Sequence, residues 1–335
     1  MSDAHATPIA WQYVCCSLPI LIPMSVYVLK KCFNNRYRTL NSKVVLITGA
    51  SSGLGETLAH EFYSHGCALI LTGRSSNELE RVKNDLLSRS DIKNVNKPCI
   101  LVLDLIDQST IEVVSQKVLG VFGRVDILIN NAGISYRGRA EATMAEVDYK
   151  VMLVNYFGQV ALTKAILPSM IHHKSGHIIA ISSVQGKIAV PFRSAYTASK
   201  HALQAFFDTL RAEISHHKVK VTVVSPGYIQ TNLSLNALTG SGSKYGVMDE
   251  STMSGYSAEY VAQRIVDAVV NDEQEVIIAP FYARLTVKLV RKCRIQGFPA
   301  IRRTSVGYSP LSSAYGNLTF DKQPGQSTRY LEISC

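Results

Sequence analysis

From Lys43 to Ile278, short apolar runs rich in β-branched residues alternate with longer stretches of helical periodicity. The short runs are almost uniformly apolar, which is typical of parallel strands covered on both faces. They predict seven strands: Val44–Thr48, Ala68–Leu71, Ile100–Leu103, Ile127–Ile129, His177–Ser182, Val221–Val224 and Val276–Ile278. Six helices are expected between them: Leu54–His65, Ser75–Ser88, Ser109–Phe122, Met144–His172, Ala195–His216 and Ala258–Asn271. The alternation predicts an α/β fold with a Rossmann-type, doubly wound parallel sheet in one domain over residues 43–280.

A different pattern occupies the N-terminus, where no charged side chain occurs from Ala6 to Leu29. Residues 9–29 are mostly apolar and, as a helix, long enough to cross a hydrocarbon core of about 30 Å. Trp11 and Tyr27 lie near the two ends of this run, where interfacial aromatic residues are common. We therefore expect residues 1–42 to form a single-pass, uncleaved membrane anchor followed by a basic linker.

Two alternatives to an anchor stay open. A hairpin would break at Pro19 and Pro23, and a cleaved signal peptide would make the protein secreted. No Lys or Arg precedes the apolar run and four follow it closely, which disfavours the signal peptide. By the positive-inside rule, the same asymmetry places the following domain in the cytosol.

The C-terminal residues 281–335 form a third region. Residues 281–303 predict a basic amphipathic helix, with one apolar face and cations mainly on another: Phe281, Tyr282, Leu285 and Leu289 against Arg284, Lys288, Arg291 and Arg294. Such a helix suits an anionic membrane surface, and it equally suits packing of its apolar face on the domain. Residues 304–335 are polar without periodicity, so we expect them to be disordered.

The net charge of +10 changes the picture only after it is divided along the chain. Residues 43–280 hold 22 basic and 22 acidic residues, so the surplus belongs to the two flanking regions. A neutral domain has no excess cations with which to displace phosphate counterions, so no nucleic-acid partner is expected. The seven cysteines are scattered without a C-x-x-C pair, which predicts a reducing compartment and no metal site.

The first predicted strand leads directly into a glycine-rich turn, Thr48–Gly55, with the spacing G-x-x-x-G-x-G. Between a strand and a helix, such a turn lets the backbone approach a pyrophosphate and presents free N–H groups to it. The second strand is followed by Arg74, without the acidic residue that would bind a ribose 2′-hydroxyl. Arg74 could pair with a 2′-phosphate, so NADP(H) is favoured over NAD(H). Asp104, after the third strand, is placed to meet the adenine.

Polar side chains follow the fourth and fifth predicted strands. Asn130–Gly133 suits a ligand crevice at the carboxyl edge of a sheet. Ser183 follows the fifth strand, and Tyr196 and Lys200 share a helix face because they are four residues apart. A nearby ammonium favours the phenolate, so we expect Lys200 to lower the pKa of Tyr196. We expect Ser183 to hold a substrate oxygen and Asn155 to hold a relay water.

These motifs, in this order over residues 43–280, resemble those of the short-chain dehydrogenase/reductase family. The resemblance implies an NADP(H)-dependent oxidoreductase with a catalytic tetrad of Asn155, Ser183, Tyr196 and Lys200. It implies that the cofactor contacts three of these (Asn155, Tyr196 and Lys200) and a further set: Gly49, Ser51, Ser52, Gly53, Leu54, Gly55, Arg74, Ser75, Asp104, Asn131, Ala132, Gly133, Pro226, Gly227, Ile229 and Thr231. If the chain behaves like the family, Met144–His172 and Ala195–His216 would form a homodimer or homotetramer interface.

A narrower likeness, to one branch of that family, is carried by five segments: Asn131–Gly138, Asn155–Gly158, Phe192–Tyr196, Lys200–Ala202 and Ser225–Ile229. The branch implies a reductase of the endoplasmic-reticulum membrane that is held there by an N-terminal segment. The C-terminal region departs from the branch, because it turns basic and then polar where relatives continue with a more hydrophobic helical end.

The long Gly- and Ser-rich segment Gln230–Tyr256 is expected to form a mobile lid over the substrate. With the anchor, its apolar residues predict a lipophilic substrate such as a steroid, a retinoid or an acyl-lipid ketone: Leu233, Leu235, Leu238, Val247 and Met248. The alternative function is a membrane-tethered NADP-binding scaffold or sensor without turnover. The intact tetrad disfavours that alternative, because a binding role needs no phenolic acid.

Overall fold

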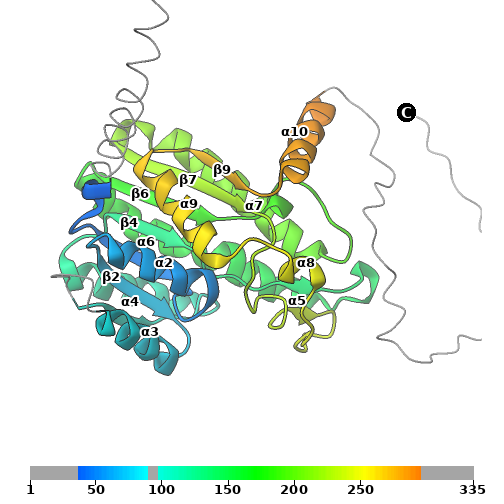
Figure 1. Cartoon of the computed structure of the whole chain (residues 1–335), viewed down its shortest axis with the longest axis horizontal. Helices are drawn as coiled ribbons and strands as arrows, with labels where there is room; N and C mark the ends of the chain where they lie inside the picture. Colours follow the sequence, from blue (N-terminus) through cyan, green and yellow to red (C-terminus); the bar gives the residue numbers. More distant parts are fainter. Residues whose placement is uncertain (1–36, 90–96, 296–335) are drawn as a thin grey trace, which may run out of the picture. The chain divides into compact units, whose positions relative to one another are not determined.

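The computed structural model describes residues 37–89 and 97–295, so the predicted anchor at 9–29 and the predicted disordered segment at 304–335 lie outside the described residues. Seven parallel strands form one sheet in the order β3-β2-β1-β4-β6-β7-β9 (Figure 1). Their bounds are β1 Val44–Thr48, β2 Ala68–Gly73, β3 Cys99–Val102, β4 Ile127–Asn130, β6 Gly176–Ile181, β7 Val219–Pro226 and β9 Glu275–Ile278. The seven predicted strands and the doubly wound α/β fold are confirmed.

The strand order reverses at β1. The chain runs outward from β1 to β2 and β3, then returns to place β4 on the other side of β1. In such sheets the loops diverge at the reversal and leave a crevice beyond the carboxyl ends of the strands. The fold therefore places any ligand site at the edge where β1 and β4 end.

The larger helices are α2 Gly53–Ser64, α3 Ser76–Ser88, α4 Gln108–Phe122, α5 Ala145–Met152, α6 Gly158–His172, α7 Ser194–Glu213, α9 Ala258–Val270 and α10 Phe281–Ile295. The short elements are η1 Arg38–Leu40, β5 Tyr136–Arg137, η2 Ala140–Ala142, η4 Val184–Gly186, η5 Ser215–His217, β8 Leu238–Thr239 and α8 Glu250–Met253. β5 and β8 pair in a separate two-stranded sheet that the sequence pattern did not predict.

One prediction needs correction, because the helix expected over 144–172 is not regular throughout. Leu153–Phe157 forms a π-helical turn between α5 and α6. Within it, the Asn155 side chain accepts a hydrogen bond from the Ile134 backbone N–H (2.8 Å) and donates one to the Ile134 carbonyl (2.9 Å). A π turn adds one residue to the helix and re-aims its neighbours. We attribute the π turn to the two hydrogen bonds that hold Asn155 against the loop after β4.

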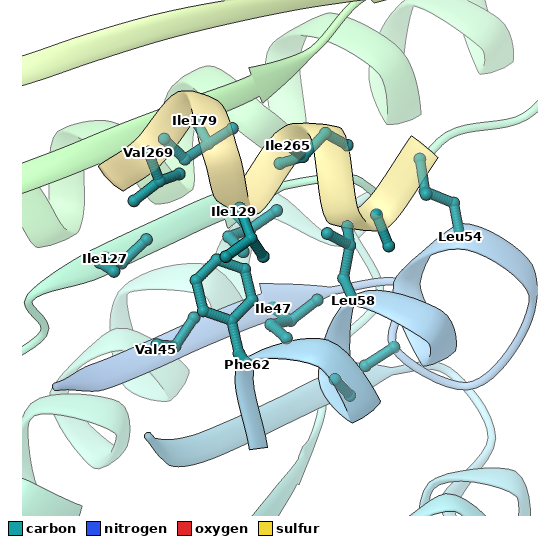
Figure 2. Packing of buried hydrophobic residues seen from close by; sticks show 14 of the residues in the cluster. Val45, Ile47, Leu54, Leu58, Phe62, Ile127, Ile129, Ile179, Ile265 and Val269 are labelled. Carbon is teal, nitrogen blue, oxygen red and sulfur yellow. The ribbon is translucent and has the colours of Figure 1, made fainter. Parts of the chain in front are cut away.

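Apolar side chains fill both faces of the sheet. Helices α2, α3 and α9 cover one face, and α4, α6 and α7 cover the other. Figure 2 shows the first of these layers, where α2 and α9 pack against β1, β4 and β6 through Val45, Ile47, Leu54, Leu58, Phe62, Ile127, Ile129, Ile179, Ile265 and Val269. Each Å² of apolar surface buried here stabilises the fold by about 25 cal/mol. This packing holds the strands, and therefore the carboxyl edge of the sheet, in place.

Among the described residues, one helix, Ala145–His172, is long and apolar enough to cross a membrane by length and composition. Its apolar residues have another explanation in this fold. Leu162, Ile166 and Met170 are buried in the core cluster against the sheet. The apolar character of this helix therefore follows from its place inside the domain.

Candidate active site

A cavity of about 790 Å³ lies at the carboxyl edge, where the sheet reverses. Its walls come from the loops that follow β1, β2, β3, β4, β6 and β7 and from the first half of α7. Every site residue predicted from the sequence lines it except Ser75 and Asn155. The topology thus brings together residues that are spread along the chain from Gly49 to Thr231.

The glycine-rich turn forms one end of the cavity. Gly49 has a φ of +64°, which favours glycine, and a Cβ at Gly55 would come within 2.0 Å of the Gly49 carbonyl oxygen. The turn is also held to the end of β4. Asn131 Nδ2 donates to the Thr48 carbonyl (2.9 Å), and Thr48 Oγ1 accepts from the Asn131 and Ala132 N–H groups (2.9 and 3.0 Å).

The start of α2 faces the cavity with free backbone donors. Its N-cap residue, Ser52, makes no side-chain hydrogen bond to the first turn. The first N–H groups of this helix and the positive end of its dipole are therefore available to an anion. The glycine cradle and these donors fit a dinucleotide pyrophosphate.

Arg74 and Asp104 line the same end of the cavity. Arg74 is exposed, and across residues 37–89 and 97–295 it forms no ion pair. Asp104 accepts a hydrogen bond from the Ile106 N–H (3.0 Å) and so is fixed by its own loop. Ser75 lies outside the cavity, where its hydroxyl caps α3 by accepting from the Glu78 N–H (3.4 Å). The structure therefore gives Ser75 a local structural contact.

Ser183, Tyr196 and Lys200 meet at the other end. The Ser183 hydroxyl accepts from the Gln185 N–H (3.1 Å) and hydrogen-bonds to the phenol of Tyr196. The Lys200 ammonium lies 5.7 Å from the centroid of the Tyr196 ring and donates to the Ile181 carbonyl (2.8 Å). Both α7 side chains are buried, at 8% and 4% exposure. A phenol, a hydroxyl and an ammonium thus lie together in one buried part of the cavity wall.

Burial shifts the pKa of two side chains in this group. Burial raises the pKa of Tyr196, and the lowering effects of the Ser183 hydroxyl, Arg137 and Arg193 do not reverse that rise. Burial also lowers the pKa of Lys200 to about 8. The pKa of Tyr196 is therefore raised overall, because burial outweighs the groups that lower it. The lowering expected from Lys200 stays a prediction.

Asn155 lies next to the cavity lining and is not part of it. Its side chain is fully buried and bonds to Ile134 and to the Ser199 hydroxyl (3.0 Å), so it does not line the cavity. Gly133, which does line it, separates Asn155 from Lys200: a Cβ at Gly133 would lie 3.2 Å from Asn155 Oδ1 and 3.6 Å from Lys200 Nζ. Asn155 thus positions the loop after β4.

A buried polar cluster beside Tyr196 was not predicted from the sequence. Arg137 donates to Asp249 Oδ2 from Nε (2.8 Å), to Ser135 Oγ (2.6 Å) and to Ser234 Oγ (3.1 Å). Arg193, three residues before Tyr196, lies 3.5 Å from the same Asp249 oxygen. The cluster joins β5 and α7 to the segment over the cavity. Asp249 carries no local sequence signal, because its main partner is 112 residues away.

In the segment Gln230–Tyr256, the residues that line the cavity differ from those expected from the sequence. Leu233 lines the cavity, but the other four apolar residues singled out in the sequence do not. Polar residues from the same segment line it instead: Asn232, Ser234, Asn236, Lys244 and Thr252. The substrate end of the cavity is therefore mixed, with an apolar contribution from Leu233 among hydroxyl, amide and ammonium groups.

Residues 43–240 match the family model described as short chain dehydrogenase. The chain is 53% identical over 276 residues to "Dehydrogenase/reductase SDR family protein 7-like" of Anopheles gambiae, covering 82% of this chain and 87% of that one. It is 52% identical over 248 residues to "Dehydrogenase/reductase SDR family member 7B" of Mus musculus, covering 74% and 76%. Relatives of this name form the narrower branch that the sequence motifs indicated.

Solved structures give the same fold. A metagenomic short-chain oxidoreductase in complex with NADP is 28% identical, covers 72% of this chain and 98% of its own, and has a TM-score of 0.59. A short-chain dehydrogenase/reductase from Burkholderia phymatum in complex with NAD is 23% identical, covers 80% and 99%, and has a TM-score of 0.69. The fold is thus compatible with either dinucleotide, and a preference must come from individual residues.

Proposed function

Because the chain belongs to the short-chain dehydrogenase/reductase family, it is an oxidoreductase, and we propose that it transfers hydride between NADP(H) and the carbonyl or secondary alcohol of a lipophilic substrate. The observation that carries the proposal is the meeting of Ser183, Tyr196 and Lys200 at one wall of the cavity whose other end is the glycine-rich cradle. A scaffold would need the cradle but not the buried phenol.

The residue roles follow from position and charge state. Tyr196 donates a proton to the carbonyl oxygen in reduction, and its raised pKa keeps it protonated at neutral pH. The Ser183 hydroxyl holds the same oxygen. Lys200 contributes a positive charge against the forming phenolate and holds a ribose hydroxyl, while Asn155 positions the loop that carries Gly133.

The cofactor proposal rests on the cradle and on Arg74. The α2 N-terminus and the turn Gly49–Gly55 hold the pyrophosphate, and the exposed guanidinium of Arg74 suits a 2′-phosphate. No carboxylate follows Gly73 at the end of β2 to bind a 2′-hydroxyl. A bound nicotinamide supplies the hydride for the carbonyl carbon.

The cavity lining supports one of the three proposed substrate classes over the other two. Asn232, Asn236 and Lys244 are exposed polar residues of the cavity lining, and a steroid or retinoid hydrocarbon offers few groups to pair with them. An amphiphilic acyl-lipid ketone would place a polar head against these groups and its chain toward Leu233. We therefore propose an acyl-lipid ketone.

Cellular placement belongs to the same proposal. Residues 9–29 anchor the protein in the endoplasmic-reticulum membrane, with the catalytic domain in the cytosol. A homodimer or homotetramer forms through α5, α6 and α7. Support for that interface comes from large exposed apolar side chains near it, Tyr149 (70%) and Phe157 (46%).

The test is a screen of lipid extracts with purified protein and NADPH, read by mass spectrometry for products heavier by two hydrogens. Wild-type protein should convert a ketone, and Tyr196→Phe should lose that conversion while its NADPH binding, measured by fluorescence, persists. Binding of NADPH with no turnover across the extracts would instead support the scaffold.

A further inference from the structure

Helix α10 has one buried side and one bare apolar side. Val287 is 1% exposed, and Ala283 and Val290 beside it are half-buried, so this side of the helix is packed against other residues. The bare side carries large apolar residues with high exposure: Phe281 (73%), Tyr282 (69%), Leu285 (43%) and Leu289 (50%). We call these four residues the α10 stripe.

Helix geometry places the stripe directly opposite the packed side. At 100° per residue, the four stripe residues span an arc of about 100°, and Val287 with Ala283 and Val290 lies about 160° from the middle of that arc. The stripe therefore lies on the opposite side of the helix from Val287. It is not the edge of the packed side.

Cations border the stripe. Arg284 and Lys288 are exposed on the helix between the stripe and the packed side, and neither has a carboxylate partner within residues 37–89 and 97–295. The whole of α10 carries five Lys or Arg and no Asp or Glu. An aromatic and leucine stripe beside a row of cations is the pattern of a helix that lies in the interface of an anionic bilayer.

A second copy of the chain would fit the α10 stripe less well than a lipid surface does. A symmetric contact through the stripe would place the cations of one α10 beside those of the other. Residues 43–280, with equal numbers of acidic and basic residues, offer no surplus of carboxylates to neutralise them. An anionic lipid surface satisfies both the stripe and the cations.

We propose that α10 docks on an anionic bilayer surface, with the α10 stripe among the lipid chains and Arg284 and Lys288 at the headgroups. The contact is separate from the N-terminal segment and does not depend on its crossing the membrane. α10 starts three residues after β9, whose Ile278 carbonyl accepts from the N–H of Gly227 (2.9 Å), a residue of the cavity wall. A short stretch of chain therefore joins the docking helix to the cavity wall.

The test uses the full chain with a single indole reporter. In a Trp11→Phe background, which removes the only native Trp, Leu285→Trp reports on the stripe and Leu87→Trp, at an exposed site on α3, serves as control. Each protein is reconstituted with vesicles of phosphatidylcholine alone or with 30% phosphatidylserine, with acyl chains brominated. We expect quenching and a blue shift at position 285 with phosphatidylserine, and neither at position 87.

Charge reversal supplies the second arm. Arg284→Glu with Lys288→Glu should weaken docking by at least about 25-fold, since each cation near such a surface contributes about fivefold. The matched control, Lys97→Glu with Lys117→Glu at exposed positions before β3 and on α4, should leave quenching unchanged. Absence of quenching at position 285 with anionic vesicles would overturn the proposal. So would quenching that ignores lipid charge, or a blue shift that depends on protein concentration without vesicles, which would indicate a second copy.

Discussion

Arg137 and Asp249 form a buried ion pair that joins β5 to the segment folded over the cavity. Two guanidinium nitrogens of Arg137 reach Asp249 Oδ2, at 2.8 and 2.5 Å, and the side chains are only 8% and 14% exposed. Arg193 approaches the same oxygen. One carboxylate thus balances two cations next to Tyr196 and links the rest of the domain to the segment Gln230–Tyr256, for which the sequence predicts a mobile lid.

Removing the Asp249 carboxylate should destabilise the folded protein. We expect Asp249→Asn to lower the free energy of unfolding by about 3 kcal/mol, because the buried guanidinium of Arg137 loses the carboxylate that it contacts with two nitrogens. The KM for substrate should rise more than the KM for cofactor, since the cluster borders the substrate end. Urea unfolding and steady-state kinetics measure both effects. The matched control is Asp272→Asn, which breaks an exposed pair with Lys220 and should cost under about 1 kcal/mol. Equal losses in the two variants would contradict a role for the cluster.

Arg74 should set cofactor preference. Arg74→Ala should reduce kcat/KM for NADPH by about tenfold to a hundredfold, the range of a charge-assisted phosphate contact, and should leave kcat/KM for NADH nearly unchanged. The ratio of the two constants is the measurement. A parallel loss with both cofactors would mean that Arg74 supports the fold of the site and does not bind a 2′-phosphate.

The strands could be predicted from sequence because each needs only a buried apolar run, and each of the seven was found within two residues of its expected ends. The meeting of Ser183, Tyr196 and Lys200 at one cavity could be predicted because these residues follow a motif. Three features could not. The π turn depends on the contact of Asn155 with Ile134, the Arg137–Asp249 pair joins distant segments, and the pKa of Tyr196 depends on how deeply α7 is buried. Each is a tertiary effect with no local pattern.

The pH dependence of reduction should follow Lys200. Its pKa of about 8 means that the ammonium is charged at pH 7 and loses its charge as pH rises through about 8, whereas Tyr196, with a raised pKa, stays protonated there. We therefore expect kcat for carbonyl reduction to be level near pH 6–7 and to fall above about 8. In Lys200→Arg, whose guanidinium stays charged, the remaining activity should not fall in that range. An unchanged midpoint in this variant would contradict the assignment.

Two glycine substitutions distinguish a steric clash in the glycine-rich turn from the general effect of replacing a helical glycine by alanine. Gly55→Ala should abolish NADPH binding and destabilise the fold by about 1–3 kcal/mol, because the new Cβ would collide with the Gly49 carbonyl. Gly120→Ala, in α4 with nothing within 4 Å of its Cβ, should stabilise the fold by about 0.5–1 kcal/mol. Calorimetry and cofactor titration check both. Normal NADPH binding by Gly55→Ala would show that the pyrophosphate does not occupy this turn.

The central claim is that Tyr196 supplies the proton while hydride passes from the cofactor to a carbonyl carbon. Its most direct measurement follows deuterium from NADPH labelled at nicotinamide C4, with mass spectrometry of the product alcohol from wild-type protein and from Tyr196→Phe. The account predicts deuterium on the former carbonyl carbon with wild type and a loss of at least about a hundredfold in its rate of appearance with Tyr196→Phe, at unchanged NADPH affinity. Equal deuterium transfer by the two proteins would contradict it.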